Sequence, residues 1–373
     1  MKKIFVIAGE ASGDLHGANL IASLKKTDPD LEIHAVGGER MASQPIASFY
    51  DLACIHVLGL TDIFCSYPKL RMAFERIAHS IRTIKPDLVV LIDNPSFNLR
   101  LAERIKRSSI PLVYYVSPQV WAWGTKRIHT IKKLVKKMIV FFGFEETLYK
   151  KYGVPVTFVG HPLIDSVRSS ADKNSLLREF DLDTEKLTIS IMPGSRINEI
   201  KNLLPVFLGA ARIIKKEICD VQFILAESIT IKENLYKKFL KDFSIITIRG
   251  RSYDALQASD FALVCSGTAT LEAAIMDTPM VIAYKTSLLT YMAAKLVIKT
   301  PYLGLVNLIS QKEIVPECLQ FKANPKYIAY KGISIIKDKK RMAEIKEGLR
   351  RVKEKLGPPG ASERAAKAVL ETL

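Results

Sequence analysis

Lys3-Ile-Phe-Val-Ile-Ala8 leads directly into Gly9-Glu-Ala-Ser-Gly-Asp14 and then into Leu15-His-Gly-Ala-Asn-Leu-Ile21. This order predicts a buried strand, a glycine-bearing turn and the start of a helix. Glycine allows a ligand to approach the peptide N–H groups closely, and the start of a helix offers unpaired N–H donors to an anion. The turn therefore either faces a phosphate or is ordinary α/β architecture. Its G-x-x-x-G spacing departs from the G-x-G-x-x-G of dinucleotide-binding proteins.

Apolar runs alternate with helix-like segments along the rest of the chain, which is typical of a parallel α/β sheet. In the first half we expect strands at 3–8, 31–36, 87–92, 111–116, 138–142 and 156–159, and helices at 14–26, 68–84, 97–107, 126–136 and 145–152. In the second half we expect strands at 187–192, 221–225, 245–248, 261–265 and 280–283. The pattern is interrupted by Gly160-His-Pro162 and a polar stretch at 169–174. The fold class is therefore α/β, with two Rossmann-like, doubly wound domains.

A chain of 373 residues is too long for one ordinary core, which also favours two domains. We expect an N-terminal domain at 1–165, completed by a C-terminal helix at about 345–373, and a second domain at 166–344. Ligands of such sheets bind beyond the carboxyl ends of the strands, so a cleft between the two domains is the expected active site. The hinge Gly357-Pro-Pro-Gly360 leaves open a monomer or a homodimer that exchanges this helix.

The net charge of +17 indicates an anionic partner. A phosphorylated substrate and an anionic membrane surface both fit this charge, whereas no zinc-finger spacing or aromatic RNA-binding signature favours nucleic acid. The five cysteines form no C-x-x-C pair, which argues against a zinc site or disulfides and suits a reducing compartment. The sequence shows no signal-peptide pattern and no apolar run of roughly 18–20 residues, so we expect a cytoplasmic protein without a membrane span.

Two turns in the second half carry residues suited to a nucleotide diphosphate. Met192-Pro-Gly-Ser-Arg-Ile-Asn-Glu199 lies where a strand ends and a helix begins. Gly194 and Ser195 can present main-chain and hydroxyl donors there, and Arg196 adds a bidentate cation. A capped helix with a solvated arginine is the alternative.

The second turn lies in Val264-Cys-Ser-Gly-Thr-Ala-Thr-Leu-Glu272. Ser266, Gly267 and Thr268 form the turn, and Glu272 falls about one helical turn further on, on the same face. A carboxylate there can accept both hydroxyls of a ribose while the turn faces phosphate. The two turns together predict a nucleotide diphosphate across the second sheet.

In the first half, Leu88-Val-Val-Leu-Ile-Asp93 places a carboxylate at the carboxyl end of a strongly apolar strand. Partial burial would raise the pKa of Asp93 and suit it to act as a general base on an alcohol, although an Asp at this position also caps helices. His16 and His161 are further candidates near strand ends, and a structural role is the alternative for each.

Three segments could contact lipid or sugar. Ser117-Pro-Gln-Val-Trp-Ala-Trp-Gly124 places Trp121 and Trp123 in a loop, where they either pack internally or form a platform for a sugar or acyl chain. The apolar segment at 58–68 predicts a membrane-facing patch with Leu60, Ile63, Phe64 and Tyr67. The basic helix expected at 126–137 could also meet a membrane, or present a solvated face.

Taken in order, these motifs resemble the lipid-A-disaccharide synthase family. The resemblance rests on GEASGD at 9–14, the strand ending at Asp93, VSPQVWAW at 116–123, the Gly-His pair at 160–161, PGSR at 193–196, SGTATLE at 266–272 and Leu305-Val-Asn-Leu-Ile309. It implies an inverting glycosyltransferase of the two-domain GT-B type, working in lipid A and lipopolysaccharide biosynthesis. Such an enzyme joins UDP-2,3-diacylglucosamine to 2,3-diacylglucosamine 1-phosphate, giving the β-1′,6-linked disaccharide 1-phosphate and UDP.

The resemblance also implies roles for individual residues. Asp93 is implied as the catalytic base, Arg196, Glu272 and Asn307 as donor contacts, and Glu10 and Ser12 as residues lining the first-domain side of the cleft. Family members often have a second Asp where this chain has Ser96. This departure concentrates the base assignment on Asp93, or weakens it if the two acids normally act together. No metal or cofactor is implied, and peripheral attachment to the inner membrane is expected because both substrates are lipid-like.

Three rival functions remain open at this point. A UDP-sugar 2-epimerase would share the fold and nucleotide site but leave the apolar segment at 58–68 without a role. A non-catalytic nucleotide- or lipid-binding module would tolerate substitution of Asp93. A NAD-dependent dehydrogenase lacks its G-x-G-x-x-G motif here.

Overall fold

The computed structural model describes residues 1–51, 63–122, 124, 126–240, 243–297 and 300–373. The chain forms two compact units. The first contains Met1–Pro162 and Gly357–Leu373, and the second contains Leu163–Leu356.

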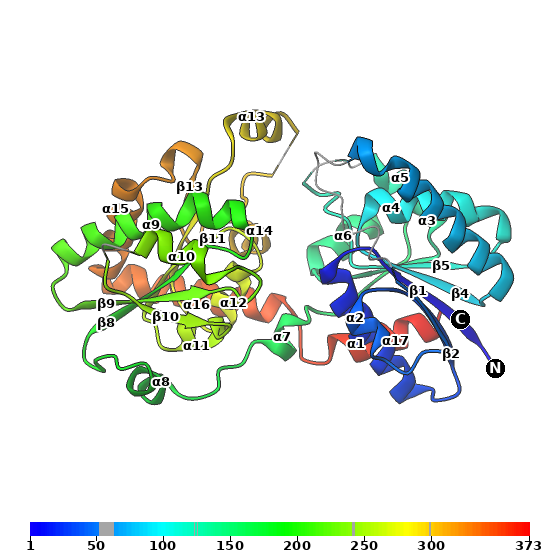
Figure 1. The fold of residues 1–373 in the computed structure, drawn as a ribbon, viewed down its shortest axis with the longest axis horizontal. Helices are drawn as coiled ribbons and strands as arrows, with labels where there is room; N and C mark the ends of the chain where they lie inside the picture. Colours follow the sequence, from blue (N-terminus) through cyan, green and yellow to red (C-terminus); the bar gives the residue numbers. More distant parts are fainter. Residues whose placement is uncertain (52–62, 123, 125, 241–242, 298–299) are drawn as a thin grey trace. The chain divides into compact units, whose positions relative to one another are not determined.

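The first unit is built on a parallel sheet (Figure 1). Within the described residues its seven strands have the order β3-β2-β1-β4-β5-β6-β7, the doubly wound arrangement expected from alternating strands and helices. The strands are β1 (Lys3–Ala8), β2 (Glu32–Gly37), β3 (Ser48–Asp51), β4 (Leu88–Ile92), β5 (Leu112–Tyr115), β6 (Lys137–Val140) and β7 (Val156–Phe158). Strands β1 and β4 pair in the centre, with Ala8 opposite Ile92, so the turns that follow these strands are neighbours.

Helices cover both faces of this sheet. Phe5 and Ile7 of β1 face one core, and Ile4, Val6 and Ala8 face the other, as the two-residue period of a strand requires. The helices of this unit are α1 (Ala11–Thr27), α2 (Glu39–Ala42), α3 (Ile63–Ile84), α4 (Pro95–Ile105), α5 (Arg127–Leu134), α6 (Gly143–Lys151) and α17 (Ala361–Leu370). Helix α17 packs against α1 and supplies Ala365, Ala366, Ala368 and Val369 to the second core.

The second unit repeats the plan. Its described residues form a parallel sheet of six strands in the order β10-β9-β8-β11-β12-β13. The strands are β8 (Leu187–Met192), β9 (Val221–Glu227), β10 (Ile246–Arg249), β11 (Phe261–Cys265), β12 (Met280–Tyr284) and β13 (Glu317–Leu319). The helices are α7 (Leu163–Ser166), α8 (Lys173–Glu179), α9 (Ile197–Glu217), α10 (Glu233–Leu240), α11 (Ser252–Gln257), α12 (Ala269–Ile275), α13 (Leu288–Val297), α14 (Leu305–Ser310), α15 (Pro325–Ile336) and α16 (Lys339–Lys355).

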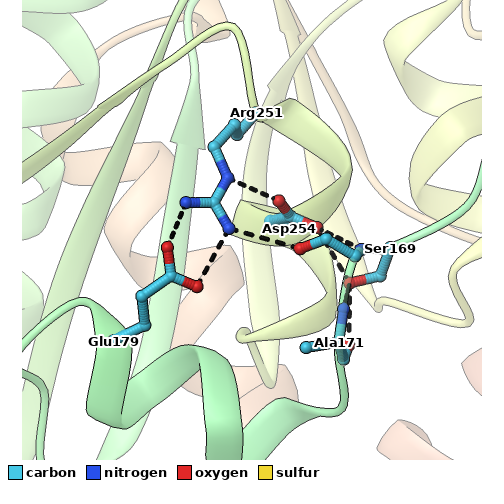
Figure 2. Close-up of polar contacts among 6 residues, drawn as sticks. Ser169, Ala171, Glu179, Arg251 and Asp254 are labelled. Atoms are coloured by element: carbon cyan, nitrogen blue, oxygen red, sulfur yellow. Dashed lines mark hydrogen bonds and ion pairs between the residues drawn. The ribbon is translucent and has the colours of Figure 1, made fainter.

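The polar stretch that interrupts the sequence pattern is fastened to the second unit by Arg251 (Figure 2). Its guanidinium binds both carboxylate oxygens of Glu179 at the end of α8 and donates to Asp254 at 2.7 Å. Asp254 in turn accepts from the main-chain N of Ser170 at 2.7 Å and the hydroxyl of Ser169 at 2.9 Å. Bidentate, charge-assisted bonds of this kind fix geometry as well as adding energy, so the segment leading into α8 is held against α11.

The structure differs from the sequence-based expectation in two strands and in the point where the chain returns to the first unit. Strands β3 and β13 were not expected, because each is a short strand that pairs on one side only and lacks a long apolar run. We expected the chain to return to the first unit at about residue 345. Helix α16 instead packs on α12 and α14 of the second unit, and the return begins at Gly357. Among the described residues, no helix is long and apolar enough to cross a membrane.

Candidate functional site

Asp93 lies at the carboxyl end of β4, in the turn that leads into α4. Asp93 and Asn94 both adopt left-handed backbone conformations, with φ of 50° and 38°. Non-glycine residues adopt this region rarely, and such strain is found where the surrounding structure enforces it. The Asn94 side chain accepts from the main-chain N of Phe97 and caps α4. Capping is therefore done by Asn94, which leaves the carboxylate of Asp93 available for chemistry.

The main chain of Asp93 is held from two sides. Tyr114 of β5 donates its hydroxyl to the Asp93 carbonyl oxygen at 2.5 Å, and the Asn98 amide donates to the same oxygen at 2.8 Å. The carboxylate is half-buried, and this desolvation raises its pKa despite hydrogen bonds from Asn94 and Ser12. The hydroxyl of Ser12 lies 3.5 Å from Asp93 Oδ2. The structure thus brings two of the expected residues, Ser12 and Asp93, together.

The opening turn has a structural half and an exposed half. A Cβ atom at Gly9 would lie 2.8 Å from the Asn94 amide nitrogen, so glycine is needed for the two turns to approach each other. Asp14 accepts hydrogen bonds from the main-chain N atoms of Gly38, Arg40 and Met41 and so caps α2. Glu10 and Ser12 are exposed. Gly9 and Asp14 therefore fit the architectural alternative, and Ser12 faces Asp93.

His16 lies among aromatic rings. Its ring centroid is 5.0 Å from that of Phe141 and 6.4 Å from that of Tyr115. Burial lowers the pKa of His16 to about 4, and burial together with the neighbouring His16 lowers that of His161 to about 3. Both imidazoles are therefore neutral near pH 7, and the buried Nδ1 atom of His16 has no hydrogen-bond partner among the described residues.

The loop after β5 is anchored by a buried carboxyl group. Trp121 donates its indole N–H to Glu145 at 3.2 Å and meets Phe144 edge-on. Glu145 is only 3% exposed, and desolvation raises its pKa to about 8. Val116, at the start of the loop, has φ of 69°, which is unusual for a β-branched residue. The indole N–H of Trp121 is bound inside the unit, and its ring is half-buried; Trp123 lies outside the described residues.

In the second unit, the Gly194–Arg196 turn lies between β8 and α9. Gly194 has φ of 110°, and a Cβ atom there would lie 2.4 Å from Glu199 Oε2. That oxygen accepts hydrogen bonds from the main-chain N of Ser195 at 3.0 Å and of Arg196 at 3.2 Å. These donors, which we assigned to a phosphate, are therefore bound by the carboxylate of the chain itself. The Arg196 side chain is 84% exposed and forms an ion pair with Glu199 at 3.2 Å.

The second turn of this unit follows β11. Gly267 and Thr268 are exposed, and the Ser266 hydroxyl donates to the Leu303 carbonyl at 3.2 Å. Glu272 is half-buried in α12, and desolvation raises its pKa to about 7. Because β8 and β11 are adjacent strands, the two turns follow neighbouring strand ends of one sheet.

Asn307 does not fit the role of a donor contact. It is completely buried in α14, and its amide donates to the Val315 carbonyl and to Glu317, each at 2.8 Å. Its oxygen accepts from the main-chain N of Ile314 at 2.8 Å and of Val315 at 3.1 Å. An Asn side chain has two donor hydrogens and two acceptor lone pairs, so this network uses all four. Asn307 therefore holds the adjoining loop and has no group left for a ligand.

The sequence did not predict a role for three residues of these sites: Tyr114, Glu145 and Glu317. Glu317 accepts from the main-chain N atoms of Leu303 at 2.9 Å and Gly304 at 3.1 Å, and thereby holds the loop that binds Ser266. None of the three belongs to a motif, and the only sequence signal is a polar atom in an otherwise apolar segment.

The membrane patch cannot be compared with the structure. Leu60 lies outside the described residues, and the side chains of Ile63, Phe64 and Tyr67 are not described, although their backbone begins helix α3. The basic helix is present as α5 (Arg127–Leu134), with Ile128 and Ile131 buried.

Solved structures with a similar fold define the class of protein. The S. aureus MnaA-UDP co-structure matches with a TM-score of 0.67 and 16% identity, covering 100% of this chain and 98% of that one. UDP-GlcNAc 2-epimerase from Neisseria meningitidis bound to UDP-GlcNAc gives 0.65 and 14%, and Acinetobacter baumannii MurG gives 0.60 and 14%, each covering 100% of both chains. The fold is therefore that of the two-domain GT-B enzymes.

The sequence comparisons are more specific. The family model described as lipid-A-disaccharide synthetase matches residues 4–371, and the chain belongs to this family. Lipid-A-disaccharide synthase from Syntrophus aciditrophicus is 42% identical over 368 residues, covering 98% of this chain and 96% of that protein. The synthase from Geobacter metallireducens is 39% identical over 374 residues, covering 100% and 97%. The chain is thus a glycosyltransferase with lipid-A-disaccharide synthase function, and the epimerase alternative is not favoured.

Proposed function

We propose that this enzyme transfers 2,3-diacylglucosamine from UDP-2,3-diacylglucosamine to the 6-hydroxyl of 2,3-diacylglucosamine 1-phosphate, with inversion at the anomeric carbon. The acceptor oxygen forms the new bond to that carbon while the bond to the diphosphate breaks, and UDP leaves with the bonding electrons. The observation that carries this proposal is the half-buried carboxylate of Asp93 at the end of a central strand.

Asp93 takes the proton from the acceptor hydroxyl. Three features support this role: the raised pKa of its carboxyl group, the backbone strain at Asp93 and Asn94, and the bonds from Tyr114 and Asn98 that hold the turn. A base is most effective when its pKa is close to the working pH and its position is fixed. Ser12, at 3.5 Å, orients the carboxylate. Glu10, His16 and Trp121 line the acceptor side in this proposal.

The donor binds to the second unit. Arg196 supports this assignment because its guanidinium is largely exposed and suited to a diphosphate. The exposed Gly267–Thr268 turn adds main-chain donors, and Glu272 accepts the ribose hydroxyls. The charge of the leaving UDP is then balanced by Arg196 and main-chain N–H groups, so we expect turnover to persist in the presence of EDTA.

Both proposed substrates carry acyl chains, so the enzyme meets them at a membrane. The net charge of +17 suits an anionic lipid surface, and the apolar segment at 58–68 is the proposed contact in the first unit. We propose peripheral association with the cytoplasmic side of the inner membrane.

The test is UDP release from the diacylated donor and acceptor by Asp93→Asn protein. Losing a general base lowers turnover by roughly 10²–10⁴-fold, and we expect a loss in this range with UDP binding unchanged. Ser96→Ala is the matched control, since Ser96 is exposed and lies three residues further on, in the first turn of α4. Near-normal turnover by folded Asp93→Asn protein would remove Asp93 from the mechanism.

A further inference from the structure

Helix α13 (Leu288–Val297) exposes a set of large apolar side chains. Leu289 is 83% exposed and Leu296 88%, and Leu288 and Met292 are also more than half exposed. Positions 288, 292 and 296 are four residues apart, and 289 lies beside them, so these side chains share one side of the helix. The half-buried Tyr291 and Ala294 mark the side that turns toward the unit.

This surface is held in place by specific contacts. The Gln320 side chain donates to the Thr286 carbonyl at 2.9 Å and accepts from the Thr286 main-chain N at 3.2 Å. The ring of Tyr291 meets that of Phe321 edge-on, with centroids 6.3 Å apart, and Phe321 is itself 73% exposed. In Figure 1 helix α13 stands beyond the strands of its own unit. We call Leu288, Leu289, Met292, Leu296 and Phe321 the α13 patch.

The two segments that carry the α13 patch have charged residues of one sign only. Residues 285–297 include Lys285 and Lys295, and residues 320–331 include Lys322, Lys326 and Lys331. Neither segment contains an Asp, a Glu or an Arg. Protein–protein interfaces are depleted in lysine and enriched in arginine, whereas apolar side chains flanked by lysines are typical of segments that lie on anionic membranes.

We propose that the α13 patch is a lipid-contact surface that inserts into the headgroup region of an anionic phospholipid bilayer. The helix has ten residues, about 15 Å at 1.5 Å per residue, so it lies in the interface and does not span. The leucine and methionine side chains enter the acyl boundary, and the lysines bind lipid phosphates. This contact goes beyond the proposed function, because it gives the second unit a membrane anchor separate from the segment at 58–68 and independent of sugar transfer.

The test is co-sedimentation of the full chain with vesicles of phosphatidylcholine alone and of phosphatidylcholine mixed with phosphatidylglycerol. We expect Leu289→Ser/Leu296→Ser protein to bind the mixed vesicles about tenfold more weakly than the unchanged chain. Ile229→Ser is the matched control, since Ile229 is 70% exposed in the same unit but outside the patch. Circular dichroism and thermal unfolding verify that each variant is folded.

A second pair of variants tests the charges. Lys295→Glu should weaken binding to the mixed vesicles and leave binding to phosphatidylcholine unchanged. Lys340→Glu, at an exposed site on α16, makes the same charge change and should leave binding to both kinds of vesicle unchanged. Equal vesicle binding by the leucine variant and the unchanged chain would overturn the proposal. A lipid-free dimer that the leucine variant abolishes, with vesicle binding retained, would assign the patch to a second copy instead.

Discussion

The Glu199 carboxylate lies 3.0 Å from the main-chain N of Ser195 and so occupies the N–H donors that precede helix α9. A side chain of the protein thus takes the position expected for a phosphate. The arrangement satisfies donors that would otherwise be unpaired at the start of the helix and places a negative charge at the positive end of its dipole. The carboxylate also forms an ion pair with the Arg196 side chain at 3.2 Å.

We predict that Glu199→Ala lowers the free energy of unfolding by about 1 kcal/mol, as loss of a helix cap does. Glu217→Ala is the control at the other end of the same helix. An acidic group there opposes the dipole, so its removal should leave stability unchanged or slightly higher. Urea unfolding of both variants measures the difference, and equal effects would exclude the capping role of Glu199.

Asn307 leads to a second prediction about stability. Its removal leaves the main-chain N atoms of Ile314 and Val315 without their acceptor inside the unit. Leaving a buried polar group unsatisfied costs about 1–3 kcal/mol, so we expect Asn307→Ala to lose at least that much stability. Asn202→Ala removes one 3.3 Å bond to Lys285 and should cost less. Thermal unfolding compares them; unchanged stability with weakened UDP binding would restore Asn307 as a donor contact.

The sequence predicted those features of the sites that depend on residues close together in the chain. Asp93 and the turns at 194–196 and 266–268 follow apolar runs that form strands, and a strand end is where a parallel sheet places ligands. The bonds of Asn307 could not be predicted, because they depend on how the loop at 314–317 folds back onto α14. The same is true of Glu145 and Trp121, which are 24 residues apart. A buried carboxyl group is recognisable only once the residues that bury it are known.

Glu272 predicts a pH dependence of nucleotide binding. Its pKa is raised to about 7, and the ionised form is the one that accepts hydrogen bonds from both ribose hydroxyls. As the pH falls through about 7, the carboxylate is protonated and UDP affinity should decrease. Calorimetry should show a larger decrease in UDP affinity for the unchanged chain than for Glu272→Gln. In that variant the protonation of UDP itself is the only remaining cause of a decrease. Parallel pH profiles would place the ribose elsewhere.

Glu145 predicts a pH dependence of stability with a defined sign. Its pKa is about 8 in the folded chain, against 4.5 for an ordinary glutamate, so between these values the folded state holds a proton that the unfolded state has released. The free energy of unfolding therefore falls as the pH rises through this window, by up to about 1.4 kcal/mol per pH unit. Glu145→Gln should remove this contribution, whereas Glu146→Gln, the adjacent residue on α6, should retain it.

The same ionisation should be visible in tryptophan fluorescence. The chain contains two tryptophans, at 121 and 123, and the Trp121 indole donates to Glu145 at 3.2 Å. Ionisation of Glu145 changes the field at the ring, so the emission of the unchanged chain should titrate with a midpoint of about 8. The titration should be absent in Glu145→Gln and present in Glu146→Gln. If the midpoint of about 8 persists in Glu145→Gln, another ionising group causes the change in emission.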